Sequence, residues 1–220
     1  MKAFYLISFL LIAGCSFGQS AFDIRYAKAV CNCLDSLKKT ELSDISLSAC
    51  FEKALDQNND AMLQELKTLY GDSAKQKGYA YGKNLAERTA ISLVKDCYTY
   101  FVLVDSLRYK DYAGLNQDSL SLALKKLDKT DPKLKTDEFY CKKAMLLFQL
   151  KKYDLSLSAI GQTLRLNPNN VQCMFLKAWI YQIKGNYDAA ILLYDKVAEL
   201  SQMNAFYIYS EVAKRKKRGN

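Results

Sequence analysis

After residue 20, apolar residues recur every three or four positions along most of the chain, which is the spacing of one face of an α-helix. In the N-terminal half this pattern predicts four helices separated by short turns. Gly71 is expected to end the third of them, because glycine readily takes the left-handed conformation that follows many helices. The four predicted helices cover about residues 22–37, 45–55, 61–70 and 85–107.

The C-terminal half contains an internal repeat. Residues 137–170 and 171–204 are each 34 residues long and align without a gap. Small residues align with small ones, as Ala144 does with Ala178, and large residues align with large ones. Each unit therefore predicts two helices that approach closely at the small residues, with the larger side chains filling the space beside them.

The order of bulky, small and tyrosine positions in both units resembles the tetratricopeptide repeat (TPR) family. In the first unit these positions are Tyr140, Ala144, Leu147, Tyr153, Ser156, Ile160, Thr163 and Pro168. In the second unit, the segment Gly185–Ala190 is similar to the turn between the two helices of that family. The resemblance implies a solenoid of stacked α-hairpins.

Weaker patterns extend the repeats in both directions. The apolar stripe over 117–132 predicts a half repeat, the second helix of a degenerate preceding unit. Residues 205–218 are expected to form a capping helix with its apolar residues inward and its basic residues outward. The sequence thus predicts an all-α protein, with a disulfide-linked helical domain over 19–110 followed by a short TPR-like α-hairpin solenoid over 117–218. The N-terminal domain resembles no family that we can name.

The first 18 residues are typical of a signal peptide, because Lys2 is followed by an apolar run and then by small residues. This run is too short to span a bilayer. We therefore expect an exported protein, periplasmic or secreted, without a transmembrane span. Ser16 and Gly18 suit cleavage before Gln19, which would release a soluble chain. The segment ending at Cys15 also resembles a bacterial lipobox, so a lipid anchor on Cys15 stays open.

The other cysteines suggest disulfides, since export leads to an oxidising compartment. They are Cys31, Cys33, Cys50, Cys97, Cys141 and Cys173. Cys31 and Cys33 face different sides of one helix and are poorly placed to bond each other. Pairing of Cys33 with Cys50 and Cys31 with Cys97 is favoured, and exchanging 31 and 33 is the alternative. A metal site or a redox pair is less consistent with the spacing, because no C-x-x-C motif is present.

The chain contains no histidine, which excludes catalysis and metal binding by imidazole. We find no catalytic constellation of carboxylate, lysine or cysteine residues, and expect neither an enzyme nor a cofactor or metal. Much of the net charge of +9 comes from the basic run Lys214–Arg218. Such a run is more typical of a solvated helix end than of a nucleic-acid site, so no nucleic acid is expected as a partner.

The resemblance places a concave inner surface on the first helix of each repeat. Candidate partner-binding residues on this inner wall are Met145, Phe148, Gln149, Phe175, Trp179, Gln182 and Tyr209. An aromatic-lined surface of this kind is typical of peptide recognition, which indicates an adaptor or scaffold for an unknown protein or peptide. Two alternatives are a structural envelope component that self-associates into a homo-oligomer, and a wall covered by the protein's own N-terminal helices.

Overall fold

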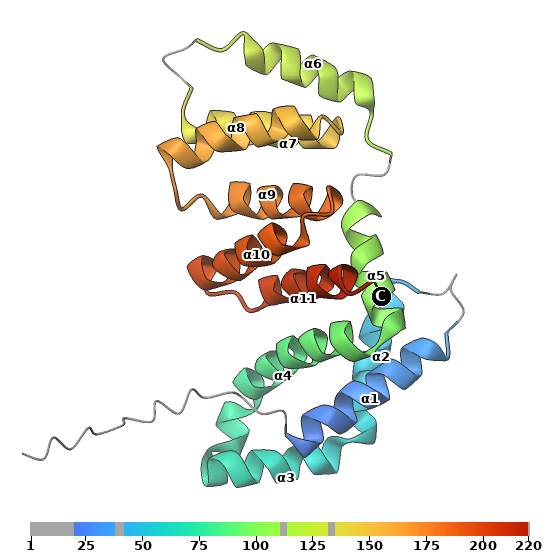
Figure 1. The fold of residues 1–220 in the computed structure, drawn as a ribbon. Helices are drawn as coiled ribbons and strands as arrows, with labels where there is room; N and C mark the ends of the chain where they lie inside the picture. The colour runs from blue at the N-terminus through green and yellow to red at the C-terminus, as the bar shows by residue number, and fades with distance from the viewer. Residues whose placement is uncertain (1–19, 38–41, 111–113, 132–134, 220) are drawn as a thin grey trace, which may run out of the picture.

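The computed structural model describes residues 20–37, 42–110, 114–131 and 135–219, and all regular secondary structure within them is helical (Figure 1). The all-α prediction is confirmed. The helices are α1 (Ala21–Asp35), α2 (Asp44–Gln57), α3 (Asn59–Tyr70), the short 3₁₀ turn η2 (Gly71–Ser73), α4 (Ala74–Asp96), α5 (Tyr98–Lys110), α6 (Gln117–Asp128), α7 (Asp137–Gln149), α8 (Tyr153–Leu166), α9 (Val171–Ile183), α10 (Tyr187–Ser201) and α11 (Ala205–Lys217). The expected signal peptide and Cys15 lie outside the described residues.

The predicted helix over 85–107 is wrong in its extent. The chain is helical from Ala74 to Asp96, leaves the helical conformation at Cys97 and resumes as α5. Cys97 is extended, with φ −110° and ψ 112°. No proline or glycine marks this break in the sequence, and its cause lies in contacts with distant segments. Gly71 does end α3 with a positive φ of 52°, as expected.

The N-terminal helices α1 to α4 surround one apolar core together with the first turns of α5. Phe22, Val30, Leu34, Leu93 and Val94 are among its most deeply buried members. Two disulfides cross-link this core, Cys33 to Cys50 and Cys31 to Cys97, with Cα–Cα distances of 5.6 and 5.7 Å. Of the two pairings that the sequence left open, this is the favoured one.

The C-terminal helices stack as hairpins, α7 with α8 and α9 with α10 (Figure 1). The small residues lie where the paired helices meet, and Ala144, Ala178 and Ala190 are fully buried. The remaining small position is polar, and Ser156 Oγ donates a 2.8 Å hydrogen bond to the carbonyl oxygen of Ala144. Close approach of the two helices therefore also satisfies the buried hydroxyl. Helix α6 packs on α7 at the open end of the stack.

Helix α11 lies between the repeats and the N-terminal helices, packed against both α10 and α4 (Figure 1). The expectation that its basic residues all face outward is wrong for Arg215, which is only 9% exposed. Its Nη1 donates hydrogen bonds to the carbonyl oxygens of Val94 and Cys97, at 2.7 and 3.2 Å. Arg215 thus supplies donors to the carboxyl end of α4, where free carbonyls and the helix dipole favour a cation.

Candidate binding surface

The inner wall of the repeats is a row of aromatic side chains, built by the first helix of each hairpin and by α11. Phe148 on α7, Phe175 and Trp179 on α9, and Tyr209 on α11 follow one another. Ring centroids of Phe148 and Trp179 are 4.8 Å apart, and those of Phe175 and Tyr209 are 5.0 Å apart. The structure therefore brings these predicted residues together on one surface.

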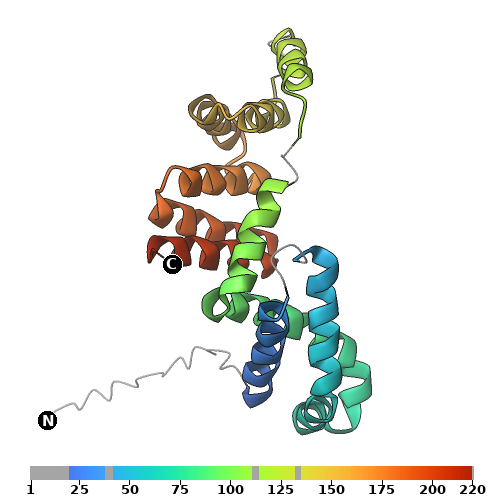
Figure 2. The same ribbon diagram turned by 90° about the vertical axis from the view of Figure 1, so that its right-hand side faces the viewer.

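Helix α5 covers one part of this inner wall. In Figure 2, α5 runs alongside the edges of α9, α10 and α11 and joins the N-terminal helices to the repeats. Arg108 of α5 places its guanidinium over the rings of Trp179 and Tyr209, at 5.5 and 5.0 Å from their centroids. Its Nη1 donates hydrogen bonds to Gln182 Oε1 at 3.3 Å and to the hydroxyl of Tyr194 at 3.1 Å.

This cover changes the role of two predicted binding residues. Trp179 and Gln182 are each 3% exposed, so both are buried inside the protein. This part of the inner wall packs against α5 of the protein's own N-terminal half, which was one of the alternatives that the sequence left open. Arg108 was not among the predicted residues, although Phe101, Val104 and Arg108 lie on one face of α5. The sequence signal for the burial of Arg108 is that this arginine continues an apolar stripe of the helix.

Another part of the inner wall stays open as a small groove of about 130 Å³. Its lining residues are Met145, Phe148, Gln149, Gln172, Phe175, Leu176 and Trp179. Met145, Gln149 and Phe175 are half-buried and offer both apolar surface and a side-chain amide. The Gln172 amide donates to the sulfur of Met145 at 3.3 Å. The groove lining carries no charged side chain, which suits an apolar, uncharged segment.

Two free cysteines lie on α7 and α9, the helices that line this groove. Cys141 on α7 and Cys173 on α9 are both buried. A hydrogen bond between the two thiols raises the pKa of Cys141, and burial raises it further. The same hydrogen bond lowers the pKa of Cys173, the accepting partner. Both thiols are buried, where a free cysteine packs as a small apolar side chain.

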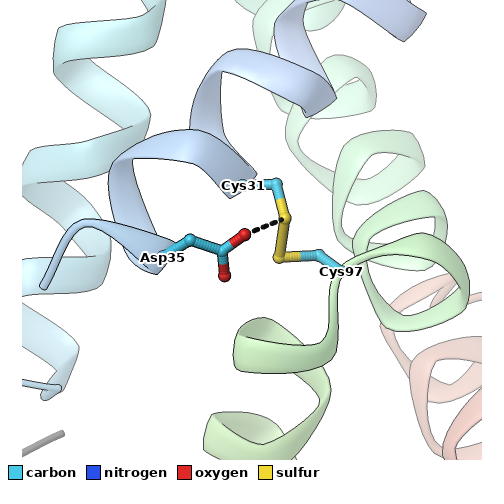
Figure 3. A group of neighbouring side chains, drawn as sticks. All are labelled: Cys31, Asp35 and Cys97. Atoms are coloured by element: carbon cyan, nitrogen blue, oxygen red, sulfur yellow. Dashed lines mark hydrogen bonds between the residues drawn. A yellow bond between two sulfur atoms is a disulfide. The ribbon is translucent and has the colours of Figure 1, made fainter.

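Cys31, Asp35 and Cys97 form the only described cluster with the ligand types of a metal site, and their sulfur and oxygen atoms lie within 4.8 Å of one another (Figure 3). The two sulfurs are joined as a disulfide, so neither is the thiolate that binds a metal ion. Asp35 also accepts a 2.5 Å hydrogen bond from the hydroxyl of Thr99. The cluster therefore links α1 to the start of α5.

Comparison with known proteins finds matches in the repeat region. A family model described as a tetratricopeptide repeat matches residues 137–170, and a second model with that description matches residues 160–191. Residues 137–191 are tetratricopeptide repeats. The first match has the bounds of the first predicted unit, and neither match covers the N-terminal half. TPR units are in general protein–protein interaction modules.

No curated protein and no solved structure matches the chain significantly. Within the described residues, none of the helices combines the length and the apolar character that crossing a membrane requires.

Proposed function

We propose that the protein is an exported adaptor or scaffold, whose TPR groove binds a protein or peptide. The single observation that carries this proposal is the open groove beside Met145, because α5, which places Arg108 over Trp179 and Tyr209, contributes no residue to the lining of this groove. The aromatic residues at its floor are held rigidly by their neighbours, so little conformational entropy is lost when a partner contacts them.

The groove lining defines the partner segment. Phe148 is only 6% exposed, so the half-buried Met145 and Phe175 offer the apolar surface for one large side chain, such as leucine, methionine or phenylalanine. Gln149 and Gln172 place amides at the rim, where they suit the backbone groups of an extended peptide. A volume of about 130 Å³ has room for one such side chain and not for a whole helix face.

A groove substitution tests this proposal. Met145→Arg places a charge in the apolar groove at a half-buried position, so the repeats should still fold while partner binding falls by about tenfold or more. Leu192→Arg is the matched control, because Leu192 is 72% exposed on α10. Affinity capture from envelope extracts should recover the same partner with wild type and Leu192→Arg, and lose it with Met145→Arg. Equal recovery with all three proteins would contradict a role for the groove.

The alternative function is a structural envelope component that uses the same surface to self-associate. Sedimentation equilibrium separates this alternative from the adaptor. A wild-type dimer that Met145→Arg converts to a monomer favours self-association, whereas a monomeric wild type favours a separate partner.

Export is the second part of the proposal. The apolar leader and the two disulfides support it, because disulfides persist in oxidising compartments. Fractionation of cells that express the full chain should place the protein outside the cytoplasm. Labelling with a palmitate analogue, compared between wild type and Cys15→Ser, distinguishes a lipid anchor from a freely soluble form. Label that Cys15→Ser abolishes identifies the anchor.

A further inference from the structure

A cavity of about 440 Å³, open to solvent, lies between α5, α9 and α11. Val104 and Leu107 of α5 form one side, Phe175 and Trp179 of α9 form another, and Ile208 of α11 forms a third. Cavities of this size, apolar and placed between packed units, are typical of small-molecule sites. The cavity is distinct in volume from the TPR groove, although Phe175 and Trp179 border both.

One charged side chain lines this cavity. Arg108 is 8% exposed, and its Nε is buried without a hydrogen-bond acceptor. A buried arginine donor without an acceptor raises the free energy of the empty protein. This Nε has almost no accessible surface, so an entering acceptor removes that cost only after a shift of the Arg108 side chain that turns Nε toward the cavity. The other guanidinium nitrogens are held in place by Gln182, Tyr194 and Asp105, so the cation is fixed at the cavity wall.

Arg108 shares its carboxylate partner with a second cation. Asp105 is the carboxylate beside it, with Arg108 Nη2 at 3.0 Å. The same Asp105 also pairs with Lys216 Nζ at 2.7 Å, so two cations share one anion. Burial raises the pKa of Tyr100, another lining residue, to about 12, and its phenol therefore stays neutral at physiological pH. Arg108, Lys216 and Asp105 together carry a net charge of +1, and of these three side chains Arg108 lines the cavity.

We propose that this cavity binds a small organic monocarboxylate with an apolar body. The apolar body would occupy the space between α5 and α11, and the carboxylate would lie against Arg108. Both halves of the ligand are needed, because the wall is largely aromatic and aliphatic while the single cation selects an anion. The inference does not rest on the proposed function, since it concerns a different volume and a different class of ligand.

The ligand pair decanoate and decan-1-ol tests the proposal. Trp179 is the single tryptophan of the chain and lines the cavity, so its fluorescence reports occupation directly. Decanoate should change this fluorescence saturably, with isothermal calorimetry giving the same affinity. The alcohol, which has the same chain without the charge, should bind at least about tenfold more weakly. Equal affinity for both, or no saturable binding of decanoate by either method, would overturn the proposal.

Two variants locate the site. Ala205→Met adds bulk at the cavity wall without removing a buried contact and should abolish decanoate binding. Ala189→Met, the same change at a half-buried position on α10, should leave binding intact. Binding that survives in Ala205→Met would place the ligand elsewhere and refute the inference. Arg108→Gln should lower the affinity for decanoate to that for the alcohol. Circular dichroism shows whether this variant folds. If it does not fold, the comparison of Ala205→Met with Ala189→Met decides the question.

Discussion

Lys151 and Gly185 occupy the same turn of consecutive TPR units, and both have a positive φ, 57° and 77°. In each turn the following residue donates its N–H to a carbonyl five positions earlier, Lys152 to Leu147 and Asn186 to Tyr181, at 2.8 Å in both. This is the Schellman arrangement, which requires a left-handed residue. Glycine takes that conformation without cost, whereas a lysine does so against the contact between its Cβ and the backbone.

We therefore expect opposite effects from exchanging residue types at these two sites. Lys151→Gly should stabilise the protein by up to about 1 kcal/mol, the strain relieved less the greater freedom of glycine in the unfolded chain. Gly185→Ala should destabilise it by about 1 kcal/mol, and through the backbone alone, since a Cβ at Gly185 would meet no atom within 4 Å. Urea unfolding followed by circular dichroism measures both. Destabilisation by Lys151→Gly would contradict the strain argument.

Arg215 carries a second prediction at the residue scale. Arg215→Gln removes the charged donor from the carbonyls of Val94 and Cys97, both buried, and should lower the free energy of unfolding by about 2 kcal/mol. Arg218→Gln, an exposed neighbour in the same basic run, is the control and should change it little. Equal effects of the two substitutions in urea unfolding would show that Arg215 contributes only through the net charge of the basic run, and not through its hydrogen bonds.

The spacing of residues in α11 contained a signal for the burial of Arg215, which the interpretation of Lys214–Arg218 as a solvated run did not use. Ile208, Val212 and Arg215 lie on one face of α11, so the arginine continues an apolar stripe. The face of a helix follows from spacing, and it predicts that the side chain points inward. Which groups it meets there depends on α4, more than a hundred residues earlier, and no local pattern contains that information.

At the scale of elements, local signals predicted most of the helices. The repeat register was readable because each hairpin is stabilised by contacts between residues near in sequence, such as Ser156 with Ala144. The break between α4 and α5 was not readable, because Cys97 is held there by a disulfide to Cys31 and by Arg215. Repeat spacing predicted that Met145, Phe148 and Phe175 lie on one wall, but the cover of the adjoining part by α5 required the tertiary structure.

The two disulfides should differ in their contribution to stability. Cys33–Cys50 spans 17 residues and Cys31–Cys97 spans 66. If restriction of the unfolded chain dominates, replacing both cysteines by alanine should cost about 3 kcal/mol for the shorter loop and about 4 kcal/mol for the longer one. Guanidinium unfolding of the two double variants measures the difference. A larger loss for the 17-residue pair would show that local native packing outweighs loop length.

At the scale of the molecule, α11 belongs to two cores. Val212 packs into the core of the N-terminal helices, and the adjacent Ala213 packs with Tyr194 among the repeats. Arg108 adds a second connection through α5. We therefore expect the N-terminal helices and the repeats to unfold as one cooperative unit, although the sequence divides them into separate domains.

A core substitution far from the repeats tests this cooperativity. Val30 is fully buried among the N-terminal helices, so Val30→Ala should cost about 2 kcal/mol. The fluorescence of Trp179, which lies in the repeats, should then shift to lower urea concentration together with the far-ultraviolet circular dichroism. Ile45→Ala, at an 82% exposed position, should shift neither signal. An unchanged Trp179 transition in Val30→Ala would mean that the two parts unfold independently.

The position of α11 also has a consequence for biosynthesis. In the sequence α11 follows the other described helices of both cores, so a growing chain holds two incomplete apolar faces until residues 205–217 have been made. A message truncated before codon 205 would yield a protein with both faces exposed, which proteases and chaperones recognise. A chain that completes folding late also stays extended for longer, and this supports the export proposed above, because channels that carry unfolded chains need an extended segment.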